Sequence, residues 1–537
     1  MTTSTADVKA GEDAAVRKER FAYWFIAVPS GPAFFALILW SSGFRAAATQ
    51  DEVCAPFGGH SSGADGASCT QISLWNETMW NASGGANCLA SDGFLSALHY
   101  THDPALPGCG DALAAYRSAA NYSCNCSGEY SFLGDASGGI RTSVVQTIAI
   151  NIDLVLSSVL FPIIGTVLDG SSRKKTYFGV VWVTGGILFF GAAVLAPGGV
   201  WVVGLVCGVL FEIFDNLKAL VWRYFLAEVA ADEPTQTMLA GRKEGASFGT
   251  QFLYAVITVG VLQLVLGLDD MLSATIAVII SATLYLGLMP IAHLRLRNHP
   301  ARSTPKGNPC VAPFTELGQT LKLAFTKYPE CAKYIALVVC CENGGGAVGI
   351  GLLTIYAQNV LGFGFLETGI ISLLLLLLGA PLCVIFPKIT AKLGPKKSWA
   401  LILVMFVVPG VVIPAAFSEP GFGAFIGVLV VYGVVGAMQL AWYITYLQPT
   451  LLMLSPADKV GSFIGLHGFC QRIGAIAQPL IYAGVVQGTN NHRVAFATGM
   501  IWVILAIVVL LTINFDKGKR DAEAGSKTLT GDVDPKP

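Results

Sequence analysis

The sequence predicts an all-α membrane protein with about twelve transmembrane helices, and two observations carry this prediction. Hydrophobic residues make up 54% of the 537-residue chain, whereas charged residues make up 12%, about half the ~25% that is typical of soluble domains. The apolar residues also gather in stretches of about 20 residues or more, the length that an α-helix needs to cross a bilayer. A soluble protein of this composition would lack the polar residues to cover its surface, and the apolar content also excludes a disordered chain.

Each predicted span is an apolar stretch bounded by short breaks. The candidate spans are residues 21–46, 143–168, 176–196, 200–227, 246–267, 272–293, 332–360, 366–391, 398–417, 421–448, 460–486 and 494–515. Breaks such as Pro197-Gly198-Gly199 are typical of turns between antiparallel helices. The first apolar stretch is too long for a cleavable signal peptide, so we expect a retained span.

Basic residues are distributed unequally between the two sides of the predicted membrane. Most Lys and Arg residues outside the spans lie in the connections that follow even-numbered spans. On the opposite side the basic residues are Arg45, Arg117, Arg141 and Arg493. Because Lys and Arg favour the cytosolic side, we predict that both termini are cytosolic. The cytosolic segments would be residues 1–20, a linker at 294–331 and a disordered tail at 516–537.

One large loop, residues 49–139, interrupts the series of spans on the non-cytosolic side. Six of the thirteen Cys residues lie in it, namely Cys54, Cys69, Cys88, Cys109, Cys124 and Cys126. Four N-x-[ST] sequons lie in it as well, at Asn76, Asn81, Asn121 and Asn125. The sequons predict a glycosylated lumenal or extracellular loop. The even number of Cys residues predicts up to three disulfides of undetermined pairing, although some thiols would stay free if pairing is partial.

The loop after the second span carries a motif, GTVLDGSSRKK at residues 165–175. Gly165, Asp169, Arg173 and Lys174 follow the pattern G-x-x-x-D plus a basic cluster. This pattern resembles the loop between spans 2 and 3 of the major facilitator superfamily. Two positions depart from the usual form, because a Gly replaces the first basic residue and a Ser replaces the second Gly. The resemblance implies the major facilitator fold.

The same resemblance implies that these four residues form a gate on the cytosolic side. In that superfamily the acidic residue meets a helix end in the opposite half of the molecule. For Asp169 we expect the partner at the start of the eleventh span, near Gly461 and Ser462, where free backbone N–H groups carry partial positive charge. Alternatively, Asp169 ends the second span and pairs locally with Arg173, which would stabilise little.

Two weak internal repeats predict that the chain is built from two similar halves. PKITAKLGPKK at 387–397 follows the register of the motif at an offset of 222 residues, with Ala391 in place of the Asp. GASFG at 245–249 and GSFIG at 461–465 are likewise offset by 216 residues. Two halves of six helices are the arrangement of many secondary carriers. The predicted pseudo-symmetric halves are residues 21–293 and 332–515.

Within that superfamily the order of features resembles the autophagy-related vacuolar effluxer family. The similarity includes one span, a long Cys-bearing lumenal loop and the run from Ser143 to Lys175. It continues with Phe225-Leu-Ala-Glu228 at the end of span 4 and the glycines that open span 5. The resemblance implies export of neutral amino acids from a vacuole or lysosome to the cytosol, whereas the residues themselves indicate a facilitator-type carrier.

Polar side chains inside the predicted spans are candidates for function, because a charge at mid-bilayer is costly. The substrate-binding or coupling candidates are Asp153, Glu212, Asp215, Asn216, Glu342, Asn343 and Arg472, and His467 and Gln471 lie near the last of them. At 100° per residue, Glu212, Asn216 and Arg223 share one helix face. Asp215 and Lys218 have the spacing of a pair within the helix.

These side chains have two interpretations. Either they pair with one another and hold the bundle together, or they bind substrate. A zwitterionic substrate needs a cation for its carboxylate and an anion for its ammonium group, which Arg472 with Glu342 or Glu212 would supply. A proton-coupled carrier also needs a buried carboxylate that takes up a proton, for which Asp153 or Glu212 is suited.

Other function classes find little support in the sequence. The two G-x-S-x-G stretches lie in the Cys-rich loop and at the start of a span, not in the strand–turn–helix setting of a hydrolase, so we do not expect an enzyme. No spacing of metal ligands is present, and we expect no metal, cofactor or nucleic-acid partner. The expected partners are a small-molecule substrate, with or without a coupled proton, and the lipid bilayer. The alternatives left open are a carrier of another solute at the cell surface and a transporter-like receptor or scaffold.

Overall fold

The chain folds as a bundle of long α-helices, and the part that the computed structural model describes contains no β-strand. The described residues are 5–40, 142–195, 201–230, 232–268, 270–301, 312–345, 352–417 and 419–530, with gaps at 34–35, 38–39, 354–355, 358–359, 362, 364, 420 and 490. The predicted loop at 49–139, with its disulfide and glycosylation candidates, lies outside these residues, so those expectations stay predictions.

The described helices form two groups in chain order. The N-terminal half contains α1 (Thr5–Phe25), α6 (Thr142–Gly170), α7 (Lys174–Ala192), α8 (Trp201–Val229), α9 (Glu233–Ala255) with its π-helical continuation η3 (Val256–Val265), and α10 (Asp270–Arg295). The C-terminal half contains α12 (Pro329–Gly345), α14 (Phe365–Leu393), α15 (Pro395–Ala416), α16 (Phe422–Val428), the π-helix η4 (Leu429–Gly436), α17 (Ala437–Leu454), α18 (Val460–Ala475), α19 (Ala477–Thr489), α20 (His492–Ala497) and α21 (Gly499–Thr512). Two further helices, α11 (Ala312–Thr326) and α22 (Phe515–Thr530), lie outside the predicted spans.

The described helices have the length and surface of membrane spans. Eight stretches are long and apolar enough to cross a bilayer, namely Ile152–Gly170, Lys174–Ala192, Glu233–Leu262, Met271–Arg295, Gly369–Leu393, Pro395–Ala416, Phe422–Leu454 and His492–Thr512. The other four predicted spans overlap with α1, α8, α12 and the pair α18–α19, several of which carry interior charges. Large apolar side chains such as Val180, Ile187 and Ile504 are about 60% exposed on the outside of the bundle, where lipid would cover them.

Local chemistry explains where two of the helices begin. The turn between α14 and α15 places Gly394 at a φ of 77°, a conformation that Gly adopts without strain, and Pro395 then opens α15. At the start of α9 the Asp232 side chain accepts a hydrogen bond from the backbone N–H of Thr235 (2.9 Å). This cap places the first residue of α9 at Glu233, well before the predicted start of that span at residue 246.

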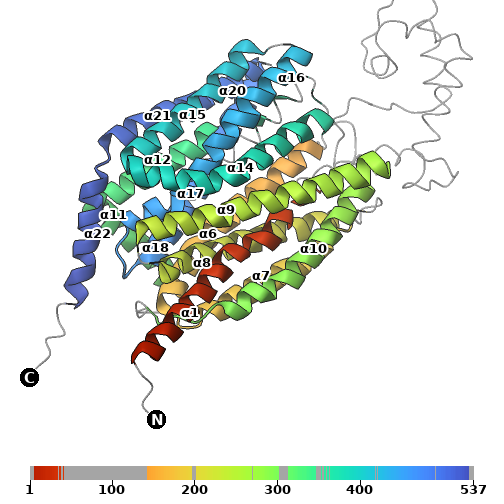
Figure 1. Ribbon diagram of the computed structural model, residues 1–537. Helices are drawn as coiled ribbons and strands as arrows, with labels where there is room; N and C mark the ends of the chain where they lie inside the picture. Colours follow the sequence, from red (N-terminus) through yellow and green to blue (C-terminus); the bar gives the residue numbers. More distant parts are fainter. Residues whose placement is uncertain are drawn as a thin grey trace, which may run out of the picture.

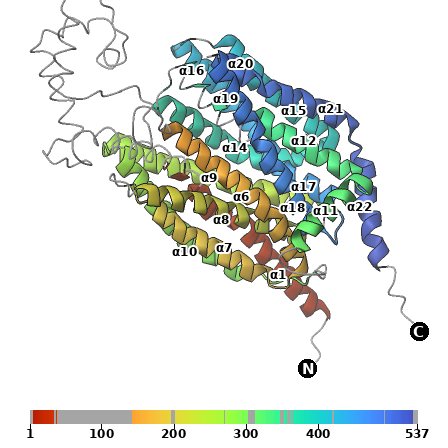
Figure 2. The ribbon, with the colours of Figure 1, turned by 180° about the vertical axis from the view of Figure 1, so that it is seen from behind.

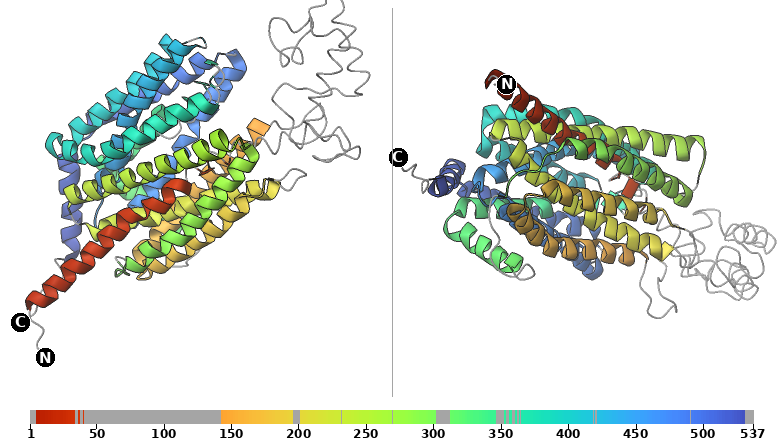
Figure 3. Two further views of the ribbon diagram at one scale, coloured as in Figure 1. Left: turned by 45° about the vertical axis from the view of Figure 1, so that its right-hand side comes forward. Right: turned by 90° about the horizontal axis from the view of Figure 1, so that it is seen from below.

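The two halves lie side by side, with the N-terminal half in warm colours and the C-terminal half in cool colours (Figure 1). The view from behind shows α18 and α6 next to each other between the halves (Figure 2). The start of α1 and the end of α22 lie at the same end of the bundle (Figure 3). The extensive contacts between halves join α6 to α18 and α9 to α14.

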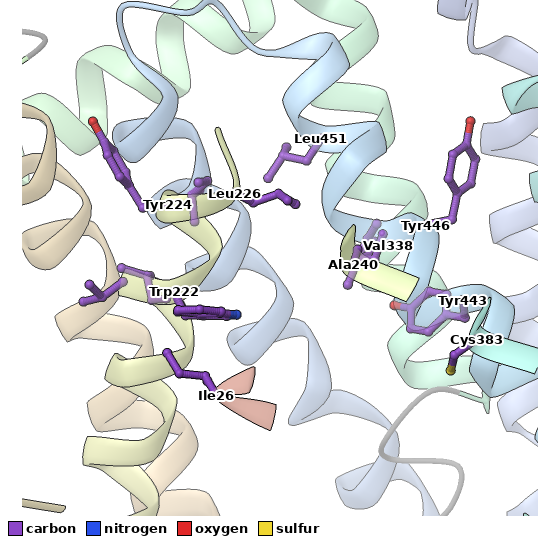
Figure 4. Close-up of a cluster of buried hydrophobic side chains, with 14 of the residues drawn as sticks. Ile26, Trp222, Tyr224, Leu226, Ala240, Val338, Cys383, Tyr443, Tyr446 and Leu451 are labelled. Atoms are coloured by element: carbon purple, nitrogen blue, oxygen red, sulfur yellow. The ribbon is translucent and has the colours of Figure 1, made fainter. Parts of the chain in front are cut away.

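One hydrophobic core extends through both halves. It includes Trp222 and Tyr224 of α8 together with Tyr443 and Tyr446 of α17, all of which are buried (Figure 4). Aromatic rings pack edge to face in this core, as between Trp399 and Tyr443, whose ring centroids are 5.9 Å apart. The core surrounds the polar residues described below and holds the helices that carry them.

Two segments differ from the sequence-based expectation. The predicted linker at 294–331 contains the helix α11, and the prediction of a disordered tail at 516–537 is wrong for the residues of α22. α22 docks because the Glu330 carboxylate accepts a hydrogen bond from the backbone N–H of Asn514 (2.8 Å), while Phe515 and Ala522 are buried against the C-terminal half. The tail is polar in composition, so its few buried positions gave too weak a signal.

Candidate functional site

α6 and α18 cross at one end of the interface between the halves, the end at which α1 begins and α22 ends (Figure 3). The buried Asp169 carboxylate accepts hydrogen bonds from the backbone N–H groups of Gly461 (2.9 Å) and Ser462 (2.8 Å) and from the Ser462 hydroxyl (2.9 Å). The first N–H groups of a helix have no partner within it, so a carboxylate is favourable at that position. The contact expected from the sequence motif is therefore present.

Glycines bring the two backbones of this crossing together. A Cβ atom on Gly165 would lie 2.5 Å from the carbonyl oxygen of Gly461, and one on Gly461 would lie 2.6 Å from that of Gly165. One turn along α18, a Cβ on Gly465 would lie 2.9 Å from the carbonyl oxygen of Phe161. Because real Cβ atoms do not approach so closely, a larger residue here would force the helices apart.

The other two residues of the predicted gate lie elsewhere. Arg173 is exposed to solvent. Lys174 is fully buried within the N-terminal half, where its ammonium group bonds Glu228 of α8 (2.8 Å) and the carbonyl oxygen of Pro300 (2.9 Å). Lys174 also lies over the ring of Tyr224, 4.7 Å from its centroid. Lys174 therefore ties α7 to α8.

A second crossing, between α9 and α14, closes the same end of the interface. A Cβ atom on Gly241 would lie 2.3 Å from the carbonyl oxygen of Cys383, and one on Gly245 would lie 2.9 Å from that of Ala380. Nearby, the Tyr446 hydroxyl of α17 donates to Glu233 at the start of α9 (3.3 Å). The two crossings together hold the halves in contact at this end.

Deeper in the interface, side chains of both halves form a polar network. The Asn216 amide donates to both carboxylate oxygens of Asp153 (3.1 Å each), and the Ser157 hydroxyl donates to one of them (2.8 Å). Arg472 of α18 donates to the amide oxygen of Asn216, and its guanidinium lies 4.0 Å from the Asp153 carboxylate. Three of the candidates thus meet in one place, and Arg472 has partners from the opposite half.

Glu342 and Asn343 lie next to each other at the end of α12 but have different surroundings. One carboxylate oxygen of Glu342 accepts hydrogen bonds from Tyr443 (2.7 Å) and Gln471 (2.6 Å). These two hydrogen bonds orient the carboxylate. The Asn343 side chain is buried and accepts a hydrogen bond from the backbone N–H of Gln478 (3.0 Å), which ties α12 to α19.

Asp215 and Glu212, one turn apart on α8, are used differently. Asp215 forms the predicted ion pair with Lys218, which also donates to the Ser30 hydroxyl of the first span (3.0 Å). Tyr285 of α10 donates to Asp215 as well (3.3 Å). Within the described residues Glu212 has neither a hydrogen bond nor an ion pair. Asp215 therefore holds helices of the N-terminal half together. Glu212 has no such contact among the described residues and stays a candidate for substrate binding or coupling.

The sequence predicted that two further polar residues, Arg223 and His467, lie in the interior, but it did not select them as binding or coupling candidates. Arg223 shares a helix face with Glu212, and the sequence leaves open whether it pairs with another side chain or binds substrate. His467 is fully buried, stacks on Tyr334 with ring centroids 6.3 Å apart, and has no partner for either ring nitrogen among the described residues. A helical-wheel projection places both residues, but only the packing shows which polar groups lack partners. No cluster of metal-binding side chains occurs in the described part of the chain.

Comparisons with known sequences identify relatives. A model of the family described as vacuole effluxer Atg22 like matches residues 227–523. An uncharacterised MFS-type transporter of Bacillus subtilis (strain 168), YxiO, is 22% identical over 370 residues, which are 67% of this chain and 82% of that protein.

Comparisons with solved structures show the same fold at 12% sequence identity. The human organic anion transporter MFSD10 (TETRAN) matches with a TM-score of 0.59 over 92% of this chain and 99% of that one. The MFS transporter FucP in its outward conformation matches with a TM-score of 0.52 over 69% of this chain and 90% of that one. The proton:xylose symporter XylE matches with a TM-score of 0.51 over 92% of this chain and 99% of that one.

The fold, the two halves and the relatives define an MFS-type transporter of small solutes, which is an integral multi-pass membrane protein and not an enzyme. The family model covers more than half of the sequence. The chain therefore belongs to the Atg22-like family of vacuole effluxers.

Proposed function

We propose that this transporter exports amino acids from a vacuole- or lysosome-like compartment into the cytosol by alternating access. The family description supports an effluxer of the vacuole. The distribution of Lys and Arg supports cytosolic termini, which puts the Asp169 end of the bundle on the cytosolic side. The two helix crossings at that end are then the cytosolic gate, with Gly165 and Asp169 as the residues that hold it shut.

The substrate class is inferred from one observation: positively and negatively charged side chains both lie deep between the halves. Arginine side chains come from both halves, on α8 and α18, and carboxylates come from both halves as well, on α6, α8 and α12. Glu342 is held in position by hydrogen bonds from Tyr443 and Gln471. An amino acid carries one carboxylate and one ammonium group, and such an interior suits it better than a sugar or a simple anion.

Glu212 is the candidate for proton coupling. It lies deep on α8 without a hydrogen bond to any described residue, and three charged side chains act on it electrostatically: Asp153 and Asp215, which are acidic, and Arg472, which is basic. Neighbouring negative charges favour the protonated form of a buried carboxyl group. We expect Glu212→Gln to retain exchange of amino acids across the membrane but to lose accumulation driven by a proton gradient. Equal gradient-driven accumulation in the variant and the wild type would exclude Glu212 as the proton carrier.

The decisive experiment measures uptake by the purified protein in proteoliposomes. Pooled amino acids, sugars and nucleosides are offered separately, each under a proton gradient of either sign. We expect uptake of amino acids that is faster under one sign of the gradient. Uptake of sugars or nucleosides alone would replace the amino-acid proposal with another carrier function, and no uptake from any pool would contradict the proposal.

A further inference from the structure

Among the residues that the structure describes, Arg223 is an interior cation without a partner. It lies on α8 between the buried residues Trp222 and Tyr224 (Figure 4), and its side chain is only partly accessible. Within the described residues its guanidinium makes no hydrogen bond and no ion pair, although it carries five N–H donors. An unpaired charge in the interior of a membrane protein is costly and marks a functional site.

The other interior cations near it are all paired. Lys218 pairs with Asp215, and Lys174 pairs with Glu228. Arg472 donates to Asn216 and faces Asp153 across the two halves. Arg472 therefore already acts as a link between the halves, and a substrate carboxylate would have to displace these partners. At Arg223 a substrate carboxylate would displace no hydrogen-bond or ion-pair partner among the described residues.

The surroundings of Arg223 suit a ligand that carries both charges. The charged groups that act on it electrostatically include Arg472, Glu244 and Glu342. The Glu342 carboxylate is held in position by hydrogen bonds from Tyr443 and Gln471. Arg223 lies seven residues beyond Asn216 along α8, which places it about 10 Å nearer the Asp169 end.

We propose that Arg223 binds the carboxylate of the substrate and that Glu342 binds its ammonium group, while Arg472 links the halves. This assignment rests on the proposed transport of amino acids and names the residues that recognise the substrate. An arginine fork binds a carboxylate through two parallel hydrogen bonds, which a lysine cannot reproduce. A bound carboxylate would supply the partners that the Arg223 guanidinium lacks in the described structure.

The test measures ligand binding as thermal stabilisation of the purified full-length protein. Three probes separate the two charges: alanine carries both, alaninamide lacks the carboxylate, and propionate lacks the ammonium group. Alanine should stabilise the wild type more than either analogue does. Arg223→Gln should weaken alanine binding roughly 30-fold or more and make alanine no better than alaninamide. Arg223→Lys should retain part of the affinity.

Matched variants distinguish binding from folding. Glu342→Gln should weaken alanine binding but leave propionate binding unchanged, since propionate has no ammonium group. Arg472→Gln should keep the preference for alanine over alaninamide, and Arg242→Gln, at an exposed position of α9, should behave as the wild type. Each variant is compared with its own ligand-free melting temperature, so a general loss of stability does not count as lost binding.

The outcomes also separate this inference from the proposed function. If alanine is transported and Arg223→Gln binds it within about twofold of the wild type, the assignment is wrong and the function stands. If no amino acid is transported, propionate still tests Arg223: stabilisation that disappears in Arg223→Gln supports the carboxylate site. If no probe stabilises the wild type, the assignment is overturned. A loss of the alanine preference in Arg472→Gln alone would move the carboxylate site to Arg472.

Discussion

The two crossings that close one end of the interface achieve the same contact in different ways. At the α9–α14 crossing, glycines at 241 and 245 lie against backbone carbonyl groups of α14, and close packing holds the helices together. At the α6–α18 crossing, glycines perform the same role, and the Asp169 carboxylate adds three hydrogen bonds to the start of α18. One crossing therefore depends on shape, and the other on shape and charge.

The start of each helix explains why only one crossing uses a carboxylate. α18 begins at Val460, so the N–H groups of Gly461 and Ser462 are free to bind Asp169. The corresponding position on α9, Gly245, lies twelve residues inside its helix, where every backbone N–H is bonded within the helix. An acid at Ala391 would find no donor there. The two crossings thus share the close packing of glycines, but only the α6–α18 crossing has a carboxylate bound to a helix start.

The largest effect is expected from steric change at either crossing. Gly165→Val and Gly241→Val each place a side chain within 2.5 Å or less of a carbonyl oxygen of the opposing helix. Overpacking costs about 1–3 kcal/mol, and backbone atoms relax poorly, so we expect roughly 100-fold less of the closed state. Labelling of single cysteines placed inside the closed end should rise in both variants.

Gly287→Val is the control for these two variants, because a Cβ atom there has no neighbour within 4 Å. It should leave labelling unchanged. If only one of the two crossing variants raises labelling, the crossings do not act together.

Asp169→Asn tests the part of the closure that depends on charge. The substitution keeps one acceptor but removes the negative charge from the start of α18, a contribution of about 0.3–1 kcal/mol when exposed and up to ~2 kcal/mol when partly buried. Because 1.4 kcal/mol is about tenfold, we expect the closed state to fall by up to roughly 30-fold. The same cysteine labelling measures it, and unchanged labelling in a normally folded variant would exclude a gate role for Asp169.

Ala391→Asp asks whether the missing acid can be restored at the second crossing. Ala391 is exposed, and α9 offers no free N–H groups at the corresponding level. We expect less than about a threefold change in labelling, within the range of a solvent-exposed substitution. A clear gain of the closed state would show that a carboxylate alone, without a helix start, strengthens the crossing.

A small effect is also expected next to the start of α18. Lys459 and Glu316 form an ion pair of 3.6 Å between partly exposed side chains. Such pairs contribute about 0–1 kcal/mol, so Glu316→Gln should change labelling by less than about fivefold, and high salt should remove the difference. An effect as large as that of Asp169→Asn would mean that α11 takes part in the closure.

The sequence predicted the helical fold, the two halves and the partner of Asp169, because these features follow from apolar stretches, motif register and free helix N–H groups. It misplaced the start of α9, since residues 233–245 are polar and contain Arg242, Lys243 and Glu244, which hide a helix from hydropathy. It also missed α22, whose few buried positions lie among charged residues. Periodicity along one element reveals its own faces but not the partner that covers them.

The same reason limited the prediction of the site. The sequence placed Asp153, Asn216, Arg223 and Arg472 in the interior and selected Arg472 as a substrate-binding candidate, but it left open which of the two arginines pairs with other side chains. The structure pairs Arg472 with Asn216 and leaves Arg223 unpaired among the described residues. Which of two arginines finds a partner depends on how α8 and α18 are rotated against each other, and no pattern within either helix contains that information.

The docking of the two chain ends offers a way to follow the rocking of the halves in real time. Glu19 of α1 accepts hydrogen bonds from Arg297 (3.0 Å and 3.3 Å) and lies 3.2 Å from His299, so the N-terminal helix is fixed to its own half. α22 is fixed to the other half through Glu330 and Asn514. A fluorescent donor on α1 and an acceptor on α22 would each report the position of one half, so their energy transfer would decrease whenever this end opens, without any label inside the membrane.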